Sequence, residues 1–202
     1  MPDSPYPLLL SPISIGTMRL RNRIVMAPMG VEIVDSDGRA NEGIVRYYEE
    51  RARGGAGLII TEVAAIAYPS GANSVHQIGM SQDAFIPALR DLTDAVHNHE
   101  GKIAVQLVHH GKVSRVDTAK GNDVLVPSIP EWHGSLSMIQ DLTDAELGLM
   151  AAANGGGAPN YKAMTTDDIA QVTDDFVEAA RRAKEAGFDG VEIHGAHGYL
   201  LS

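Results

Sequence analysis

Short apolar runs alternate with longer helical patterns along most of the chain, and this alternation limits the fold more than any other feature. The runs are rich in β-branched residues and fall at residues 23–28, 57–62, 102–108 and 190–194. Helical patterns lie between or before them, at residues 44–53, 82–99 and 166–186. Strands that alternate with helices are typical of βαβ units, and near-continuous apolar strands are covered on both faces. The sequence therefore predicts an α/β fold with a parallel sheet.

Several ends of these elements have local signals. Gly54-Gly55 and Gly187 follow two of the helices, at positions where glycine commonly ends a helix. Ser81 precedes the pattern at residues 82–99 and is expected to cap that helix. Residues 13–20 predict a hairpin that plugs one end of a barrel.

The stretch at about residues 112–164 lacks the alternation and predicts a long loop insertion. It contains one expected short helix, because Thr143 and Glu146 have the spacing of a capping box. Two interpretations of its later part, residues 130–164, stay open: a surface insertion, or a lid that shapes a substrate pocket and carries Trp132 and His133.

Composition excludes several classes of protein. The net charge of −10 repels a phosphate backbone, so nucleic acid is not an expected partner. The chain has no cysteine, which excludes disulfides and thiolate metal sites in these residues and fits a reducing cytoplasm. No run of about 18 apolar residues and no secretory leader is present, so neither a membrane span nor export is expected.

Polar or otherwise special residues stand at the end of each predicted strand. They are Pro28 and Met29 after the first, Glu62 and Val63 at the second, Gln106, His109 and His110 at the third, and His194, His197 and Tyr199 at the fourth. The carboxyl ends of the strands in a parallel barrel form one face, and that face holds the active site. We therefore expect these residues to converge on one ligand.

The cluster after the last strand carries the strongest signal. His194-x-x-His197-x-Tyr199 places three ring side chains in a glycine-rich turn, where their value for packing is low. The pattern favours a functional site over a structural role. A metal site is the alternative, with His109 and His110 as further ligands, but the motif has no Asp or Glu and the chain has no cysteine.

Five stretches resemble the old yellow enzyme and NADH:flavin oxidoreductase family, in the order in which that family has them. They are LRNRIVMAPM at residues 20–29, YYEERARGGAG at 47–57, LIITE at 58–62, KIAVQLVHHG at 102–111 and AGFDGVEIHGAHGYLL at 186–201. Within the family, the pattern is more similar to bacterial members and to relatives resembling 2,4-dienoyl-CoA reductase than to the yeast enzymes.

The resemblance implies a (β/α)₈ TIM barrel with FMN across its C-terminal face, of which residues 1–202 would be the N-terminal half with about four strands. It also implies a role for each matching residue. Toward the flavin, Pro28 and Met29 would lie along the ring, Val63 would contact it through the main chain, and Gln106 would hydrogen-bond its pyrimidine edge. Toward the substrate, His194 and His197 would bind the carbonyl oxygen, with His194 also near the flavin. Tyr199 would donate a proton to the substrate.

The implied activity is that of an ene-reductase. FMN would take hydride from NADH or NADPH and pass it to the β-carbon of an α,β-unsaturated carbonyl compound or an enoyl thioester. Two imidazole N–H groups suit the negative charge that develops on the carbonyl oxygen, and a phenol suits proton transfer to the α-carbon. The expected partner is this small-molecule substrate.

The chain also departs from the family pattern. An arginine facing the flavin and the phosphate-binding strands would belong to the other half-barrel, and an iron–sulfur cluster would occur only in a longer parent chain. The expectation is therefore completion by the missing half or by a homo-oligomer, and the alternative is a non-catalytic half-barrel that acts by association. Gly30 stands where several relatives have a Thr or Cys that tunes the flavin, so the flavin potential is expected to differ.

Overall fold

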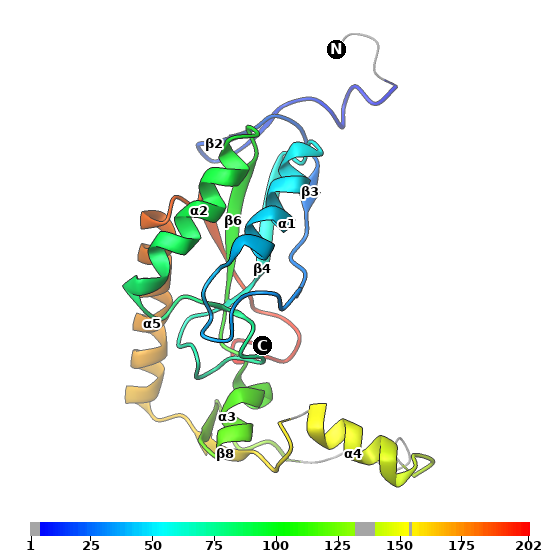
Figure 1. The fold of residues 1–202 in the computed structure, drawn as a ribbon. Coiled ribbons are helices and arrows are strands. Elements are labelled where there is room, and N and C mark those ends of the chain that lie inside the picture. Colours follow the sequence, from blue (N-terminus) through cyan, green and yellow to red (C-terminus); the bar gives the residue numbers. More distant parts are fainter. Residues whose placement is uncertain (1–4, 132–139, 154) are drawn as a thin grey trace.

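A parallel sheet forms the centre of the computed structural model, which describes residues 5–131, 140–153 and 155–202. Its strands are β3 (Val25–Met26), β4 (Leu58–Ala65), β6 (Lys102–Val108) and β9 (Gly190–Ile193). They are ordered β3-β4-β6-β9, and the short strand β5 (Ile78–Gly79) also pairs with the end of β4. All these pairings are parallel (Figure 1). The predicted α/β architecture is confirmed, with four successive strands of a barrel wall.

Helices pack on one side of this sheet (Figure 1). They are α1 (Glu42–Arg53), the single 3₁₀ turn η1 (Asp83–Phe85) that leads into α2 (Ile86–His97), and α5 (Thr166–Glu185). Asn41 caps α1 by accepting from the Ile44 N–H, and Thr165 and Asp168 form a capping box at the start of α5. Among the helices of the described residues, none has the length and apolarity needed to cross a membrane.

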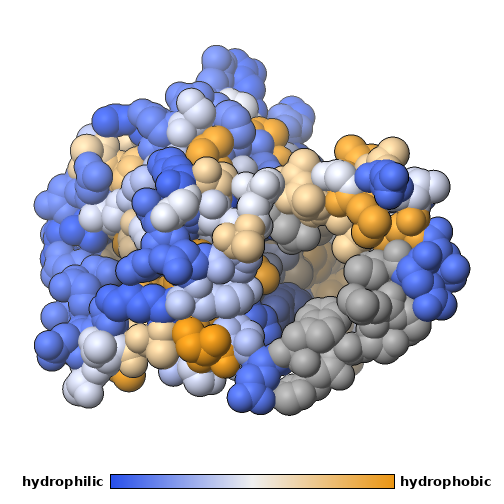
Figure 2. Space-filling model, turned by 90° about the horizontal axis from the view of Figure 1, so that it is seen from below, coloured by the Kyte–Doolittle hydropathy of each residue, from blue (hydrophilic) through white to orange (hydrophobic). Residues whose placement is uncertain are grey.

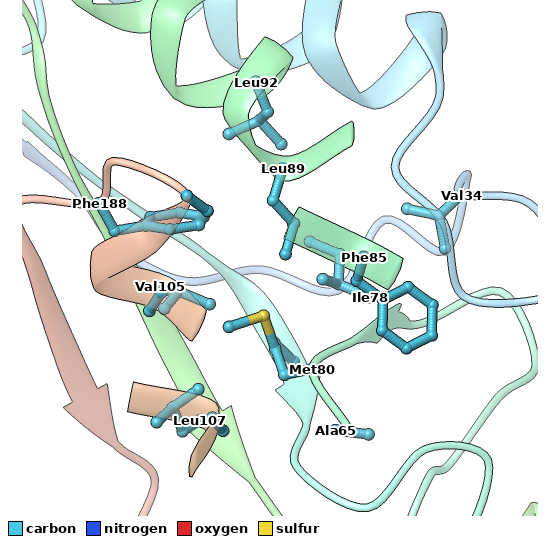
Figure 3. Packing of buried hydrophobic residues seen from close by; sticks show 14 of the residues in the cluster. Val34, Ala65, Ile78, Met80, Phe85, Leu89, Leu92, Val105, Leu107 and Phe188 are labelled. Atoms are coloured by element: carbon cyan, nitrogen blue, oxygen red, sulfur yellow. The ribbon is translucent and has the colours of Figure 1, made fainter. Parts of the chain in front are cut away.

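The main core lies between the helices and the sheet. Figure 3 shows Leu89 of α2, Val105 and Leu107 of β6, and Met80 gathered in this layer. Each of these side chains is at most 1% exposed. Burying a side chain of this size stabilises the fold by roughly 1.5–3 kcal/mol. Because Val105 and Leu107 face the helices, the alternating residue Gln106 is directed to the other face of the sheet.

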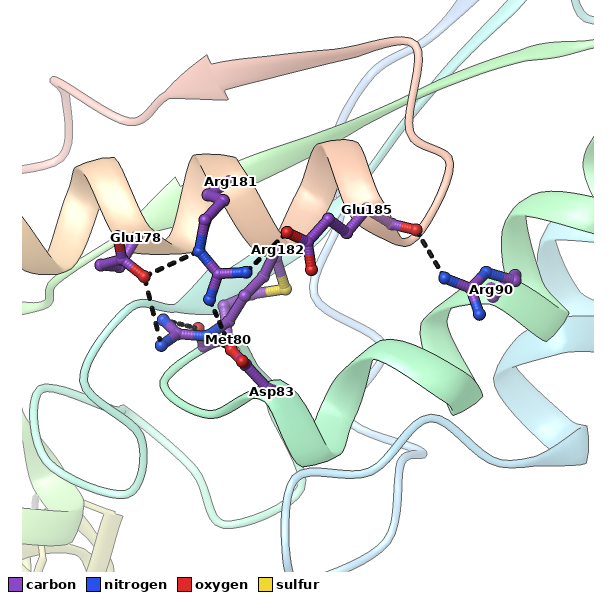
Figure 4. Close-up of polar contacts among 7 residues, drawn as sticks. All are labelled: Met80, Asp83, Arg90, Glu178, Arg181, Arg182 and Glu185. Atoms are coloured by element: carbon purple, nitrogen blue, oxygen red, sulfur yellow. Dashed lines mark hydrogen bonds and ion pairs between the residues drawn. The ribbon is translucent and has the colours of Figure 1, made fainter.

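Polar contacts join α5 to the segment before α2 (Figure 4). Arg182 donates from Nε to the Asp83 carboxylate at 2.8 Å and from Nη1 to the Met80 carbonyl at 3.2 Å. Arg90 of α2 donates to the carbonyl of Glu185 at 2.8 Å. These bonds fix α5 beside α2, and so fix the position at which the chain enters β9.

The start of α2 differs from the prediction. Ser81 does not cap the helix, because its hydroxyl donates to the carbonyl of Tyr68 at 2.7 Å. Gln82 precedes the 3₁₀ turn without a side-chain cap. The Ser81 hydroxyl instead binds the loop that contains Tyr68.

The predicted hairpin is confirmed as β1 (Ile13–Ile15) paired antiparallel with β2 (Met18–Leu20). Leu20 packs against Leu58 and Ala104, which lie near the beginnings of β4 and β6. The hairpin therefore covers the amino ends of the strands and leaves their carboxyl ends open.

The stretch expected to be mostly irregular contains more regular structure than predicted. It holds η2 (Gly111–Val113), α3 (Arg115–Lys120), β7 (Asp123–Val126), α4 (Asp144–Ala153) and β8 (Asn160–Ala163). β7 and β8 pair in parallel with each other, a contact that strands of four residues do not reveal by periodicity. The capping box of Thr143 and Glu146 is confirmed at the start of α4. Trp132 and His133 lie outside the described residues.

The helix α4 buries none of its residues. Seen from the end at which the strands finish, most of the surface is hydrophilic, and apolar residues gather at the right edge where α4 lies (Figure 2). Leu149 is 71% exposed there.

Candidate active site

A cavity of about 220 Å³ opens at the carboxyl ends of the four strands. All seven residues predicted for the site line it: Pro28, Met29, Val63, Gln106, His194, His197 and Tyr199. The hydrogen-bond register explains this convergence, because Val63 lies opposite Gln106, and Gln106 lies opposite Glu192 close to the end of β9. The predicted placement is confirmed, while the role of each residue stays a prediction.

His194, His197 and Tyr199 form one ring cluster. The ring of His194 lies 4.9 Å from that of His197 and 5.0 Å from that of Tyr199, measured between centroids. His197 Nδ1 lies 3.0 Å from His194 Nε2, so one imidazole donates its N–H to the other. Burial, followed by the charge of His197, lowers the pKa of His194. The lowered pKa favours the neutral form of the His194 ring.

A left-handed turn produces this arrangement. His197 has a φ of 61°, and Gly198 beside it has a φ of 65°. This conformation is uncommon for a residue with a Cβ atom and is found preferentially where the surroundings enforce it. It turns the chain sharply after β9, so that side chains three residues apart face one another.

His110 is a fourth ring in the cavity, as its place after the third predicted strand led us to expect. Its centroid lies 4.6 Å from that of Tyr199, and its side chain is 1% exposed. The Nδ1 atom lies 3.0 Å from the carbonyl of Gly71, so Nδ1 carries the proton and donates it. Burial lowers the pKa of His110 to about 4, which makes it a neutral ring at pH 7.

The expectation that His109 would converge with the other strand-end residues is wrong. His109 is buried, its Nδ1 accepts from the Gly111 N–H at 3.1 Å, and it does not line the cavity. Within the described residues, no group of three His, Cys, Asp or Glu side chains could hold a metal ion. The alternative of a histidine metal site therefore has no ligand set in this part of the chain.

Gln106 presents an amide to the cavity while being 4% exposed. Its Nε2 donates to Glu192 Oε1 at 3.3 Å, a long bond that a better-placed acceptor would replace. An amide can donate and accept at once, which is what the edge of a pyrimidine ring requires.

Three further residues line the cavity: Glu62 was expected there as a strand-end residue, whereas Asn73 and Gln77 were not predicted. Glu62 Oε1, Asn73 Oδ1 and Gln77 Nε2 are buried and have no hydrogen-bond partner within the described residues. Buried polar atoms are normally satisfied, so these atoms fit a cavity that receives a polar ligand or water. The sequence signal for Glu62 was its charge inside an apolar strand, whereas Asn73 and Gln77 lie in a loop without any pattern.

The cavity also suits a flat ligand along the segment after β3. A Cβ atom added at Gly30 would meet nothing within 4 Å, so the main chain there is open to the cavity. The residues that line the cavity in the described part of the chain include no Lys or Arg. These residues fit the ring system of FMN, and its phosphate would be held elsewhere.

Comparison with known proteins agrees with this geometry. A family model described as the NADH:flavin oxidoreductase / NADH oxidase family matches residues 8–202. An NADH oxidase of Thermoanaerobacter brockii is 36% identical over 197 residues, which are 97% of this chain and 27% of that protein. An NADPH dehydrogenase of a Geobacillus strain is 36% identical over 196 residues, which are 96% of this chain and 50% of that protein.

Solved structures give the same result. The old yellow enzyme from a Pichia species superposes with a TM-score of 0.77 at 30% identity, over 96% of this chain and 47% of that one. The fold is therefore part of the TIM barrel of these enzymes, and the chain spans about half the length of that enzyme and of the NADPH dehydrogenase, and less of the NADH oxidase. The chain belongs to the NADH:flavin oxidoreductase / NADH oxidase family.

Proposed function

We propose that this chain forms the substrate-activating half of an FMN-dependent oxidoreductase that reduces the C=C bond of α,β-unsaturated carbonyl compounds, enoyl thioesters included. Hydride comes from NADH or NADPH, as the names of the NADH oxidase and NADPH dehydrogenase relatives suggest. The observation that carries the proposal is the meeting of His194, His197 and Tyr199 in one cavity with Gln106.

The flavin would be held mainly by the strand ends. The segment at Pro28 and Met29 and the main chain of Val63 would contact its ring, and Gln106 would pair with its pyrimidine edge. His194, 8% exposed, would close the same site from β9. When bound, FMN supplies the hydride transfer, which no protein side chain can carry out.

The histidine pair would bind the substrate through its carbonyl oxygen. The rings now bond to each other across 3.0 Å, and a carbonyl oxygen between them would replace that bond with two N–H donors. Donors placed where negative charge develops stabilise the transition state without reorganisation. This arrangement would polarise the alkene and hold its β-carbon toward the flavin.

Tyr199 would donate the proton to the α-carbon. Its ring lies 5.0 Å from His194 and 5.9 Å from His197, between centroids, so its hydroxyl can reach a substrate held by the pair. The neutral ring of His110 packs against it, with the two ring centroids 4.6 Å apart.

Further barrel strands would complete the enzyme. β3 and β9 form the two ends of the strand order, and Val191 and Ile193 of β9 are 43% and 59% exposed. We propose that a second half-barrel or a second copy covers these side chains and supplies the cation for the phosphate. An iron–sulfur cluster would occur only in a longer parent chain.

The test measures two half-reactions separately in variants: reduction of the flavin by NADPH, and reoxidation of the reduced flavin by an enone. Tyr199→Phe is expected to slow reoxidation of the reduced flavin by an enone by about 10²-fold or more, because general acid catalysis is worth about that much. Reduction of the flavin by NADPH should be unchanged. Tyr161→Phe is the matched control, since Tyr161 lies on β8 and does not line the cavity. Equal rates of flavin reoxidation by the enone in the wild type and Tyr199→Phe would refute the assigned role.

A further inference from the structure

Glu62 carries a carboxylate into the interior of the sheet. It lies in β4 between Thr61 and Val63, is 1% exposed, and stands where the pairing register with β6 shifts between Ile60 and Val63. An ionised side chain is costly in such a place unless backbone or side-chain donors compensate it. The position therefore calls for a specific role.

Two consecutive backbone amides compensate the carboxylate. The N–H groups of Val31 and Glu32 donate to the same oxygen of Glu62, at 2.6 and 3.1 Å. Glu32 has a φ of 52°, the left-handed conformation that brings successive N–H groups to one side and forms an anion-binding concavity. The segment after β3 thus wraps its backbone around this carboxylate.

Glu62 is itself fixed from the opposite side. Its own N–H donates to Tyr48 Oη at 2.6 Å, and Tyr48 is a fully buried residue of α1. This bond and the pairing of β4 fix the main chain of Glu62, whereas the loop that donates to its carboxylate has no helix or strand of its own.

The anchored segment is part of the candidate active site. Residues 27–41 have no helix or strand, and Pro28, Met29 and Gly30 within them line the cavity. Met29 is 62% exposed, so packing alone does not hold this segment. The two bonds to Glu62 fall directly after Gly30.

We propose that Glu62 is a positioning residue that holds the Val31–Glu32 backbone and thereby sets the course of the Pro28–Gly30 segment along the flavin. The claim about the flavin rests on the proposed function, whereas the claim about the loop does not. The residue acts through the loop and needs no contact with the reacting atoms.

The first experiment measures amide hydrogen exchange in the flavin-free chain for the wild type and Glu62→Gln. We expect the Val31 and Glu32 amides to exchange at least tenfold faster in the variant, because hydrogen bonds to an ionised acceptor are stronger than those to a neutral one. Amides in α5 should be unaffected. Glu42→Gln is the matched control, since Glu42 is exposed and its carboxylate pairs with Arg46 on the surface of α1. Unchanged exchange at Val31 and Glu32 would overturn the proposal.

A variant-free measurement covers the case in which Glu62→Gln does not fold. In the wild type, NMR couplings across hydrogen bonds should link the amide nitrogens of Val31 and Glu32 to the Glu62 carboxylate carbon. Resolved amide signals that lack these couplings would overturn the proposal.

The effect on the flavin is measured separately. Glu62→Gln should weaken FMN binding at least tenfold and change the absorption band of the bound flavin, while Glu42→Gln should match the wild type. Faster exchange at Val31 and Glu32 with unaltered flavin affinity and spectrum would overturn the positioning role. If the wild-type chain itself takes up no FMN, the proposed function fails for this chain, and the exchange experiment still decides whether Glu62 holds the loop.

Discussion

The burial of His110 predicts how far the free energy of unfolding falls as the pH is lowered. Its imidazole is 1% exposed and donates from Nδ1 to the carbonyl of Gly71. Burial is the main cause that lowers its pKa, while His109, His194 and Arg115 add a smaller electrostatic effect in the same direction. The folded chain therefore binds a proton at this ring less readily than the unfolded chain does.

The size of the effect follows from the two pKa values. The ordinary value is 6.5 and the folded value is about 4, a difference of 6.5 − 4 = 2.5 pKa units. At about 1.36 kcal/mol for each unit, His110 removes about 3 kcal/mol of stability between pH 7 and pH 4. The sign is that of a histidine with a lowered folded pKa: the unfolded state takes up the proton first, so stability falls as pH falls below 6.5. About 2 kcal/mol of this loss is expected by pH 5.

The perturbation is His110→Gln, and the assay is urea unfolding followed by circular dichroism from pH 7 to pH 4.5. The lost bond to Gly71 lowers the stability of the variant by the same amount at every pH. The wild type should lose about 2 kcal/mol more than the variant between pH 7 and pH 5. Parallel pH profiles, or an NMR titration that puts the pKa of His110 near 6.5, would refute the reasoning.

Three further substitutions test the fold. Thr165→Ala removes the capping box of α5 and should cost about 1 kcal/mol in the free energy of unfolding, whereas Thr173→Ala on the exposed side of the same helix should cost clearly less. Ile59→Ala empties a fully buried site in β4 and should cost about 2–5 kcal/mol in urea unfolding, so a value below 1 would contradict the packing. Asp189→Asn weakens the bonds from Lys102 Nζ and the Ile103 N–H and should lower stability by about 2 kcal/mol in thermal unfolding, and an unchanged melting temperature would argue against these bonds.

The strands were predictable in proportion to their burial. β6 has the predicted bounds of residues 102–108, because every residue after Lys102 is buried and the run is unbroken. β4 continues to Ala65, beyond the predicted end at Glu62, because the charge of Glu62 resembles the end of a strand. β3 has only Val25–Met26 of the predicted residues 23–28, since the register with β4 covers those two residues and Ile24 adds only its carbonyl, which accepts from the Leu58 N–H.

The pair of β7 and β8 shows a different limit. Each has four residues, and each pairs with the other, from Asp123 opposite Asn160 to Val126 opposite Ala163. The contact joins segments far apart in the sequence, and nothing within either segment indicates its partner. The prediction of a loop insertion around them therefore missed regular structure.

The candidate site was predictable where residue type and strand position agree. Gln106 and His194 follow from a parallel sheet whose carboxyl ends share one face. The bond between His194 and His197 depends on a left-handed turn, and the anchoring of Glu62 depends on amides from another segment. Such contacts are set by tertiary structure, so the residue pattern alone does not reveal them.

The most direct test of the central claim is an absorption spectrum of the purified 202-residue chain with FMN, followed by anaerobic NADPH or NADH and then an enone. The account predicts a shifted flavin band, bleaching by the nicotinamide and return of the colour with the enone. A flavin spectrum identical to that of free FMN at saturating protein would contradict the claim that residues lining this cavity form a flavin site.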